Sequence, residues 1–202
     1  MTDTTPENLW TLRSPEETRA MYADWAATYE GEIAETYKTP ERLSKALAGI
    51  IEDKTQAVLD FGCGTGLSGM ALAAEGFTTI DGTDITPEML EKAREKPAYR
   101  TLWLSEPGDV IPTDHYKIIA AIGVVSLGAA APELHDMLLS ALPKGGIYAF
   151  SYNDPTLQDA AYMDKLTALT EAGTIKVLLE DYGPHLLSKN MNSAVYIVEK
   201  TS

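Results

Sequence analysis

A glycine stands at every second position of the segment 62–66, directly after the apolar run 57–59 and the carboxylate of Asp60. Glycine has no Cβ atom, so the backbone of such a loop can approach a bound small molecule and adopt the positive φ angles of a tight turn. Residues 67–75 have the pattern of a helix whose first free N–H groups point into the same region. The segment therefore predicts a small-molecule site at the end of a buried strand.

The glycine loop fits two classes of ligand. Gly64, Gly66 and Gly69 have the G-x-G-x-x-G spacing of dinucleotide-binding loops, and Asp84 stands where such proteins carry an acidic residue. However, Asp60 and Asp84 are both expected at strand ends, where they would repel a pyrophosphate. The sulfonium and ammonium groups of S-adenosylmethionine suit acidic strand ends better. A nicotinamide-dependent (NAD(P)) oxidoreductase stays open as the alternative.

Two segments carry a resemblance to a known family. Residues 58–66 together with residues 82–90 resemble the class I S-adenosylmethionine-dependent methyltransferases. The resemblance extends over residues 21–152, and within the family the chain is similar to the methyltransferase-like proteins of the Williams-Beuren region. It implies S-adenosylmethionine as the cofactor and in-line transfer of its methyl group to a small-molecule acceptor. A protein that binds this cofactor without transferring the methyl group is a further alternative.

The resemblance also implies roles for individual side chains. Asp60 would help to orient the amino group of the cofactor, although a strand-end aspartate can also cap its own loop. Asp84 would accept hydrogen bonds from both ribose hydroxyls, and Glu106 stands near the position where relatives bind the adenine amino group. Met89 would lie beside the adenine or in the core. The expected cofactor-binding residues are Tyr29, Asp60, Gly62, Cys63, Gly64, Gly66, Asp84, Ile85, Met89, Ser105, Glu106 and Ile122.

No side chain is assigned as a catalytic residue. The segment 123–128 lacks the Asn-Pro-Pro-Tyr or Asp-Pro-Pro-Tyr motif of amino-methylating enzymes and the carboxylate cluster of magnesium-dependent ones, so no metal is expected. His115 and His135 are expected to be structural, and His185 is expected in an exposed turn. Alignment of the acceptor and exclusion of water would then supply much of the acceleration.

Apolar strand-like runs alternate with capped helices, which is the pattern of a doubly wound α/β fold. We expect a mostly parallel, seven-stranded sheet with a C-terminal antiparallel hairpin around residues 183–184. Residues 1–54 would be an N-terminal helical appendage that forms a lid on the Rossmann-like core of residues 55–202. The expected strands are 57–61, 78–83, 99–104, 117–122, 146–152, 176–182 and 194–200, and expected helices include 14–29, 132–142 and 154–172.

An aromatic stripe marks the N-terminal segment. Tyr22, Trp25 and Tyr29 recur at helical spacing. Such a stripe suits either a packed core face or a lid that closes over the cofactor and the acceptor. Both interpretations stay open at this point.

Composition sets the expected partners and compartment. The 202 residues carry a formal net charge of -14, which argues against binding to nucleic acid and to anionic membrane surfaces. The single cysteine, Cys63, excludes an intrachain disulfide, and residues 1–10 lack the features of a signal peptide. We therefore expect a cytoplasmic protein whose partner is a small molecule, and neither nucleic acid nor a membrane. The oligomeric state is left open.

Overall fold

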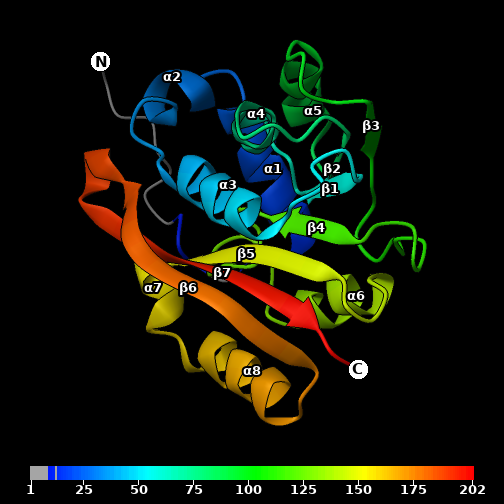
Figure 1. Cartoon of the computed structure of the whole chain (residues 1–202). Coiled ribbons are helices and arrows are strands. Elements are labelled where there is room, and N and C mark those ends of the chain that lie inside the picture. The colour runs from blue at the N-terminus through cyan, green and yellow to red at the C-terminus, as the bar shows by residue number, and fades with distance from the viewer. Residues whose placement is uncertain (1–8, 12) are drawn as a thin grey trace.

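The computed structural model describes residues 9–11 and 13–202 and contains one seven-stranded sheet (Figure 1). The strand order is β3-β2-β1-β4-β5-β7-β6. Strands β1 to β5 pair in parallel, whereas β7 pairs antiparallel with both β5 and β6. This topology confirms the expected α/β fold with a C-terminal antiparallel hairpin. The strands are β1 (Val58–Phe61), β2 (Ile80–Asp84), β3 (Thr101–Leu104), β4 (Ile118–Ala121), β5 (Ile147–Asn153), β6 (Ile175–Leu186) and β7 (Met191–Lys200).

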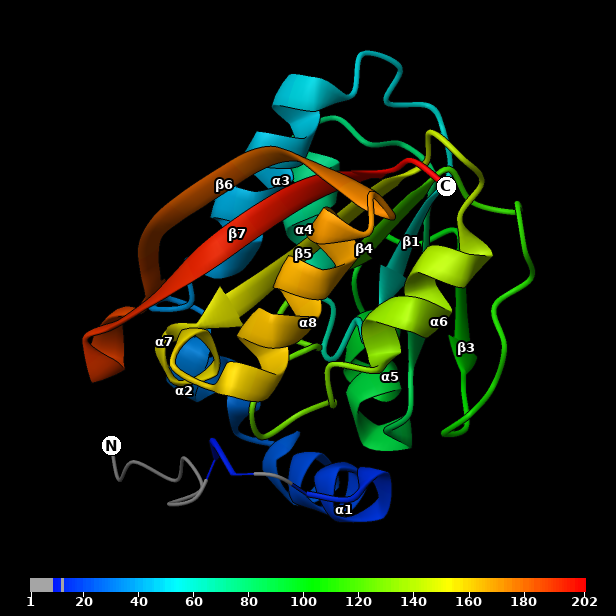
Figure 2. The same cartoon turned by 90° about the horizontal axis from the view of Figure 1, so that it is seen from below.

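Helices cover both faces of the sheet. Helices α3 and α4 pack on one face, and α6 and α8 pack on the other (Figures 1 and 2). Helices α1 and α2 lie beyond the carboxyl ends of the parallel strands (Figure 2). No helix among the described residues has the length and apolar character that a membrane span requires. The helices are α1 (Pro15–Trp25), α2 (Tyr29–Ile33), α3 (Thr39–Ile50), α4 (Leu67–Ala74), α5 (Pro87–Arg94), α6 (Leu134–Ala141), α7 (Asp154–Leu157) and α8 (Ala160–Glu171).

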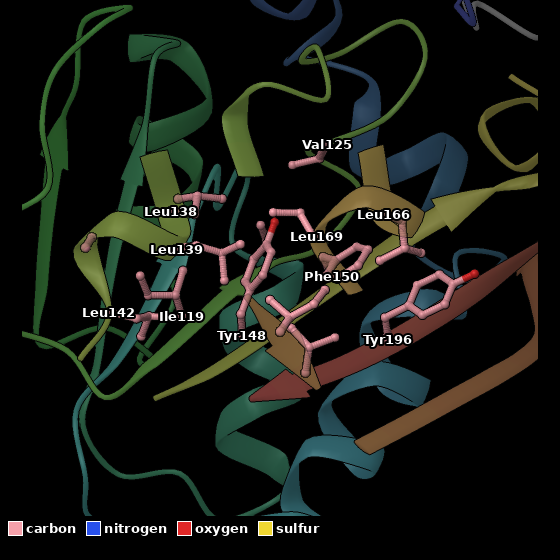
Figure 3. Packing of buried hydrophobic residues seen from close by; sticks show 14 of the residues in the cluster. Ile119, Val125, Leu138, Leu139, Leu142, Tyr148, Phe150, Leu166, Leu169 and Tyr196 are labelled. Atoms are coloured by element: carbon pink, nitrogen blue, oxygen red, sulfur yellow. The ribbon is translucent and has the colours of Figure 1, made fainter. Parts of the chain in front are cut away.

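Consecutive residues of the central strands point to opposite faces, and both faces are buried. Leu59 and Ile119 belong to the cluster under α6 and α8, part of which is drawn in Figure 3. Val58 and Ile118 belong to the cluster under α3 and α4. A strand that is covered on both sides must be apolar at nearly every position, which explains the continuous apolar runs of the sequence. Two carboxylates are nevertheless buried in these strands, Asp60 of β1 and Asp81 of β2, and Asp60 lies two residues before the glycine loop.

The N-terminal helix is shorter than its sequence pattern predicts. Ser14 begins α1 with a capping box, in which the Glu17 N–H donates to the Ser14 hydroxyl at 3.2 Å and the Ser14 N–H donates to the Glu17 carboxylate at 2.8 Å. Helix α1 ends at Trp25, and Tyr29 begins the separate helix α2. The rings of Trp25 and Tyr29 still pack edge to face, with centroids 4.7 Å apart. The aromatic cluster is therefore preserved across the break.

The helix expected over residues 154–172 is in fact two helices. The Asn153 side chain accepts a hydrogen bond from the Thr156 N–H at the start of α7, and the Asp159 side chain accepts one from the Ala161 N–H at the start of α8. Each side chain satisfies an N–H group that has no partner within its helix. Two successive N-caps therefore divide the segment.

The C-terminal hairpin turns later than expected. Strand β6 continues through Gly183 and Pro184, and the turn is made by the 3₁₀ segment Leu187–Lys189. Proline is tolerated because β6 is an edge strand, and its pairing with β7 shifts register after Pro184. The expectation that His185 lies in an exposed turn is therefore wrong, since His185 is a buried residue of β6.

Candidate functional site

A cavity of about 520 Å³, which we call the main cavity, opens at the carboxyl ends of strands β1 to β4. Ligands of open parallel sheets bind at this edge. Tyr22 of α1, Tyr29 of α2 and Tyr37 contribute to its lining. Of the residues expected to bind the cofactor, those that line the main cavity are Tyr29, Gly62, Cys63, Gly64, Asp84, Ile85, Met89, Ser105, Glu106 and Ile122, whereas Asp60 and Gly66 do not line it.

The glycine loop after β1 leaves the main cavity open. Gly62, Gly64 and Gly66 have φ angles of +68°, +52° and +92°, which side chains rarely adopt. A Cβ atom on Gly64 would meet no atom within 4 Å, whereas one on Gly66 would lie 3.1 Å from the Tyr99 ring. Gly64 therefore allows a ligand to approach the backbone, and Gly66 allows the loop to pack against Tyr99.

Asp84 is held at the rim of the main cavity by the glycine loop and by the start of α5. One carboxylate oxygen accepts a hydrogen bond from the Gly64 N–H at 2.8 Å, and the other accepts one from the Thr86 N–H at 2.8 Å. Each oxygen keeps a further lone pair, so the carboxylate can still accept two donors from a ligand. Burial raises the pKa of Asp84, although these hydrogen bonds oppose the shift.

Asp60 lies behind the glycine loop and is 0% exposed. One of its oxygens accepts hydrogen bonds from the hydroxyls of Ser68 at 2.6 Å and Tyr99 at 2.7 Å, and the other has no partner among the described residues. Burial raises the pKa of Asp60 to about 6. Sequence reasoning missed Tyr99, because it lies 39 positions from Asp60 and no local pattern joins the two residues.

Glu106 is engaged by the N-terminal helix. Its carboxylate forms an ion pair with Arg19 of α1 at 2.9 Å, and 60% of the Glu106 side chain is exposed. Arg19 also donates a hydrogen bond to the carbonyl oxygen of Ile85. These two contacts attach α1 to the loops after β2 and β3, where the adenine part of the cofactor was expected. The role of Glu106 toward adenine stays a prediction.

Tyr22, Tyr29 and Tyr37 all line the main cavity. Burial raises the pKa of each, to about 12 for Tyr22, so all three are neutral donors at pH 7. A Cβ atom on Gly123, which follows β4, would lie 2.5 Å from the Tyr37 hydroxyl. Tyr37 was missed in the sequence, because only the folded chain brings it to the end of β4.

A smaller cavity of about 60 Å³, which we call the side cavity, adjoins the main cavity. Both are lined by Tyr22, Tyr29, Tyr37 and Gly123. The side cavity extends to His185, whose Nδ1 atom lies 2.8 Å from the Thr39 hydroxyl. Burial lowers the pKa of His185 to about 4, so the imidazole is neutral at pH 7.

His135 has a structural role. It is a buried residue of α6, with its two ring nitrogens 3.0 Å and 2.6 Å from the hydroxyls of Tyr148 and Tyr152. Both nitrogens are therefore used within the core, as expected for a histidine with no catalytic function. Within residues 9–11 and 13–202, no three acidic, histidine or cysteine side chains are grouped as metal ligands.

The sequence matches a known protein family and individual relatives. The family described as "Methyltransferase domain" matches residues 58–143. Methyltransferase-like protein 27 from Homo sapiens is 33% identical over 126 residues, which cover 56% of this chain and 51% of that protein. The 18S rRNA (guanine-N(7))-methyltransferase from Bos taurus is 46% identical over 61 residues, which cover 30% of this chain and 21% of that protein. The chain thus spans about half or less of the length of these relatives.

Solved structures show the same fold at low sequence identity. The cyclase SpnF has a TM-score of 0.72 at 12% identity, with 95% of this chain and 97% of that chain covered. Magnesium protoporphyrin IX methyltransferase from Synechocystis PCC 6803, solved with bound S-adenosylmethionine, has a TM-score of 0.63 at 14% identity, with 80% and 78% covered. At such identities the similarity concerns the fold alone.

One expectation about partners is corrected by these relatives. The net charge predicted that the chain does not act on nucleic acid, but relatives from Bos taurus and Saccharomyces cerevisiae are 18S rRNA methyltransferases. The yeast enzyme is 31% identical over 129 residues, which cover 56% of this chain and 47% of that enzyme. Total charge is a poor guide here, because phosphate contacts depend on local basic groups. Nucleic acid therefore belongs among the acceptors to be tested.

Proposed function

This chain belongs to the class I S-adenosylmethionine-dependent methyltransferases, whose cofactor is S-adenosylmethionine, and we propose that it transfers the cofactor's methyl group to a small-molecule acceptor. The main cavity would hold the cofactor, and the acceptor would lie beside Tyr22, Tyr29 and Tyr37. The observation that carries the proposal is the pairing of the open glycine loop with the Asp84 carboxylate at one edge of the sheet.

The residues of the main cavity fit the parts of this cofactor. Asp84 has free lone pairs for the two ribose hydroxyls, and the open side of Gly64 suits the methionine part. The carboxylate of Asp60, directly behind the loop, favours the positively charged ammonium and sulfonium groups. Ile85 and Met89 offer apolar surface to the adenine ring. A pyrophosphate would meet the same two carboxylates at close range, which disfavours a dinucleotide.

When bound, the cofactor supplies a methyl group whose carbon–sulfur bond breaks as a lone pair of the acceptor forms the new bond, with the broken bond's electrons kept by S-adenosylhomocysteine. The part of this chain is to align the acceptor in line and to exclude water. We assign that part to a lid made of α1 and α2, which Arg19 attaches to the cavity rim through Ile85 and Glu106.

The small-molecule acceptor is supported by the aromatic residues that line the two cavities. Trp25, Tyr22 and Tyr29 pack on one another, with ring centroids 4.7 to 6.3 Å apart, next to the region where the acceptor would lie. Such a site suits a ligand that is small enough to be surrounded. The division into a lid of residues 1–54 and a core of residues 55–202, and a location in the cytoplasm, stay predictions.

Two measurements test the proposal in sequence. Titration calorimetry with S-adenosylhomocysteine and with NADH should show binding of the first only, and tight binding of NADH alone would overturn the cofactor assignment. Labelled S-adenosylmethionine is then incubated with the protein and either a small-metabolite extract or 18S rRNA. Label in a small molecule supports the proposal, and label in the RNA alone makes nucleic acid the acceptor. Cofactor binding with no transfer to either indicates a binding protein.

A further inference from the structure

The side cavity holds three buried side chains whose donors have no acceptor among the described residues. They are Ser151, Asn153 and His185, which are 2%, 7% and 9% exposed, and all three line this cavity. The donor nitrogens of Asn153 and His185 are not among the fully buried side-chain atoms that lack a partner, so they remain accessible from the cavity, and a ligand that brings an acceptor oxygen can bond to them. The direction of each donor follows from the hydrogen bonds that the rest of its side chain makes.

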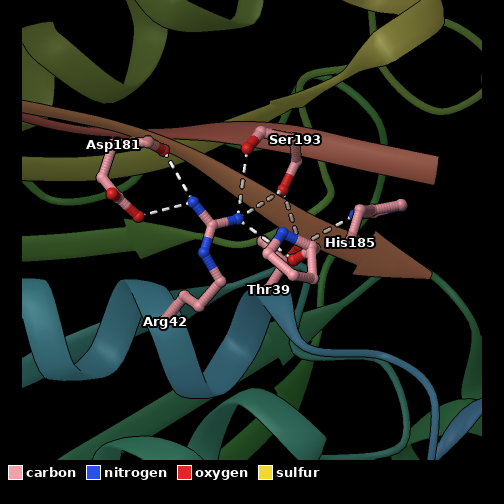
Figure 4. Close-up of polar contacts among 6 residues, drawn as sticks. Thr39, Arg42, Asp181, His185 and Ser193 are labelled. Atoms are coloured by element: carbon pink, nitrogen blue, oxygen red, sulfur yellow. Dashed lines mark hydrogen bonds and ion pairs between the residues drawn. The ribbon is translucent and has the colours of Figure 1, made fainter. Parts of the chain in front are cut away.

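A chain of hydrogen bonds determines which nitrogen of His185 carries the proton (Figure 4). Arg42 donates to the Ser193 hydroxyl at 3.2 Å, the hydroxyls of Ser193 and Thr39 are 2.8 Å apart, and the Thr39 hydroxyl is 2.8 Å from His185 Nδ1. One arrangement gives both buried hydroxyl hydrogens an acceptor: Ser193 donates to Thr39, and Thr39 donates to Nδ1. The neutral imidazole then carries its hydrogen on Nε2, so His185 is a donor and not a general base.

The amide of Asn153 is oriented by its capping role. Its Oδ1 atom accepts hydrogen bonds from the Thr156 N–H at 3.1 Å and the Thr156 hydroxyl at 2.6 Å. The NH₂ group therefore points away from Thr156, and it has no acceptor among the described residues. The Ser151 hydroxyl accepts a hydrogen bond from the Gly123 N–H at 3.0 Å, which leaves its own hydrogen available to a ligand.

The charge of the residues that line the side cavity determines which kind of ligand oxygen it can bind. No lysine, arginine, aspartate or glutamate is found among the residues described as lining the side cavity. A carboxylate would be buried there without a counter-charge, and an ammonium group would be buried there without a carboxylate to pair with. Resting on the function proposed above, we propose that the side cavity binds a neutral carbonyl oxygen of the methyl acceptor, as found in a ketone, an ester or an amide. Ser151, Asn153 and His185 are the residues that determine this specificity.

The volumes of the two cavities indicate which part of the acceptor lies in each of them. A volume of about 60 Å³ admits a few heavy atoms, so only the carbonyl end of a molecule enters the side cavity. The remainder extends past Tyr22, Tyr29 and Tyr37 into the main cavity, because these residues line both spaces. Recognition of the carbonyl would thereby fix the distance of the nucleophile from the end of the glycine loop.

The tautomer of His185 can be measured without knowledge of the acceptor. Long-range ¹H–¹⁵N correlation spectra of the labelled protein at pH 7 should show a neutral imidazole protonated on Nε2. A spectrum of the Nδ1–H tautomer, or of an imidazolium, would overturn the donor assignment. His115, which is exposed in the described structure, supplies an internal reference for a solvated histidine.

Three matched probes test the recognition of a neutral oxygen. Acetophenone carries the carbonyl, α-methylstyrene replaces its oxygen by a CH₂ group of similar shape, and benzoate carries a carboxylate. Titrations are followed by the side-chain signals of Asn153 and His185 in protein saturated with S-adenosylhomocysteine. Acetophenone should bind at least tenfold more tightly than either other probe. Equal binding of α-methylstyrene would overturn the proposal, and tighter binding of benzoate would replace the neutral oxygen by a carboxylate.

Two variants remove one donor each while keeping the structural hydrogen bonds. Asn153→Asp keeps an oxygen for the Thr156 donors, and His185→Asn keeps an acceptor near the Nδ1 position. Each should weaken acetophenone binding about tenfold and leave the affinity for S-adenosylhomocysteine unchanged, whereas His115→Asn should change neither. Unchanged acetophenone binding in both variants overturns the assignment. If a variant does not fold, the three probes tested on the unmodified protein still decide whether the side cavity recognises a neutral oxygen. If the unmodified protein itself does not bind S-adenosylhomocysteine, the proposed function is refuted instead.

Discussion

The backbone N–H of Gly64 donates a hydrogen bond to the Asp84 carboxylate at 2.8 Å, so the glycine loop after β1 and the acidic end of β2 form one unit. The sequence marks the two residues separately, as parts of two motifs. In the fold, β1 and β2 are parallel neighbours, which brings their carboxyl ends together. A change at Asp84 therefore acts on the ligand and on the shape of the loop.

Replacement of Asp84 should weaken cofactor binding. In Asp84→Ala the affinity for S-adenosylhomocysteine is expected to fall by about 2 to 4 kcal/mol, because two buried hydrogen bonds to a carboxylate are lost. Calorimetry compares this variant with Glu91→Ala, which removes an exposed carboxylate of α5. A loss below about 0.5 kcal/mol in Asp84→Ala would mean that the carboxylate does not contact the ligand.

Asp60 should make the stability of the protein depend on pH. Burial raises its pKa in the folded state to about 6, above the ordinary value of 3.8, so the folded state binds the proton more strongly than the unfolded state. The stabilisation that this protonation gives is complete below about pH 4 and is lost as the pH rises through 6. Relative to Asp60→Asn, which has no such titration, the unmodified protein should lose free energy of unfolding between pH 4 and 6.

Urea denaturation of both proteins from pH 4 to pH 8 measures this difference. The comparison with Asp60→Asn removes the titration of Asp60 and keeps Asp84 and the other titrating groups in both proteins. The difference should be constant above about pH 7. A relative stability that rises with pH would show that the hydrogen bonds from Ser68 and Tyr99 outweigh burial.

The aromatic residues of the proposed lid should matter for transfer. Tyr29→Ala is expected to lower turnover on the acceptor by about tenfold or more, since the acceptor would lose alignment and water would enter. Tyr29→Phe keeps the ring that packs on Trp25 and should retain most of the activity. Turnover of labelled S-adenosylmethionine and circular dichroism are recorded for both. Full activity in Tyr29→Ala with an unchanged fold would refute the lid.

Local patterns were sufficient for the central part of the fold. The runs that became β1 and β4 are largely apolar, β2 ends in the motif of residues 82–90, and the glycine loop has a strong sequence signature, so their positions followed from the sequence. The turn at residues 183–184 was misplaced because glycine followed by proline is typical of turns. An edge strand with a register shift tolerates the same pair, and that context is a property of the sheet.

Long-range pairs in the site could not be predicted. The contact of Tyr99 with Asp60 and the approach of Tyr37 to Gly123 join residues that no periodicity or motif relates. His185 shows the consequence most directly, because its environment comes from α3 and β7 through Thr39 and Ser193. Its placement in a loop suggested exposure, whereas its placement in β6 explains its burial and its depressed pKa.

A matched pair of glycine substitutions separates backbone strain from ligand contact. Gly64 and Gly173 have similar φ angles, +52° and +64°, and a Cβ atom on either would meet nothing within 4 Å. Gly64→Ala and Gly173→Ala should therefore destabilise the protein by a similar amount, about 1 to 2 kcal/mol, from the left-handed conformation alone.

Gly64 lines the main cavity, whereas Gly173 lies exposed between α8 and β6. Only Gly64→Ala should lower the affinity for S-adenosylhomocysteine, by at least about tenfold, because its methyl group occupies space that the ligand needs. Thermal unfolding and calorimetry of both variants give the two quantities, and equal affinities would show that the ligand does not approach the loop at Gly64.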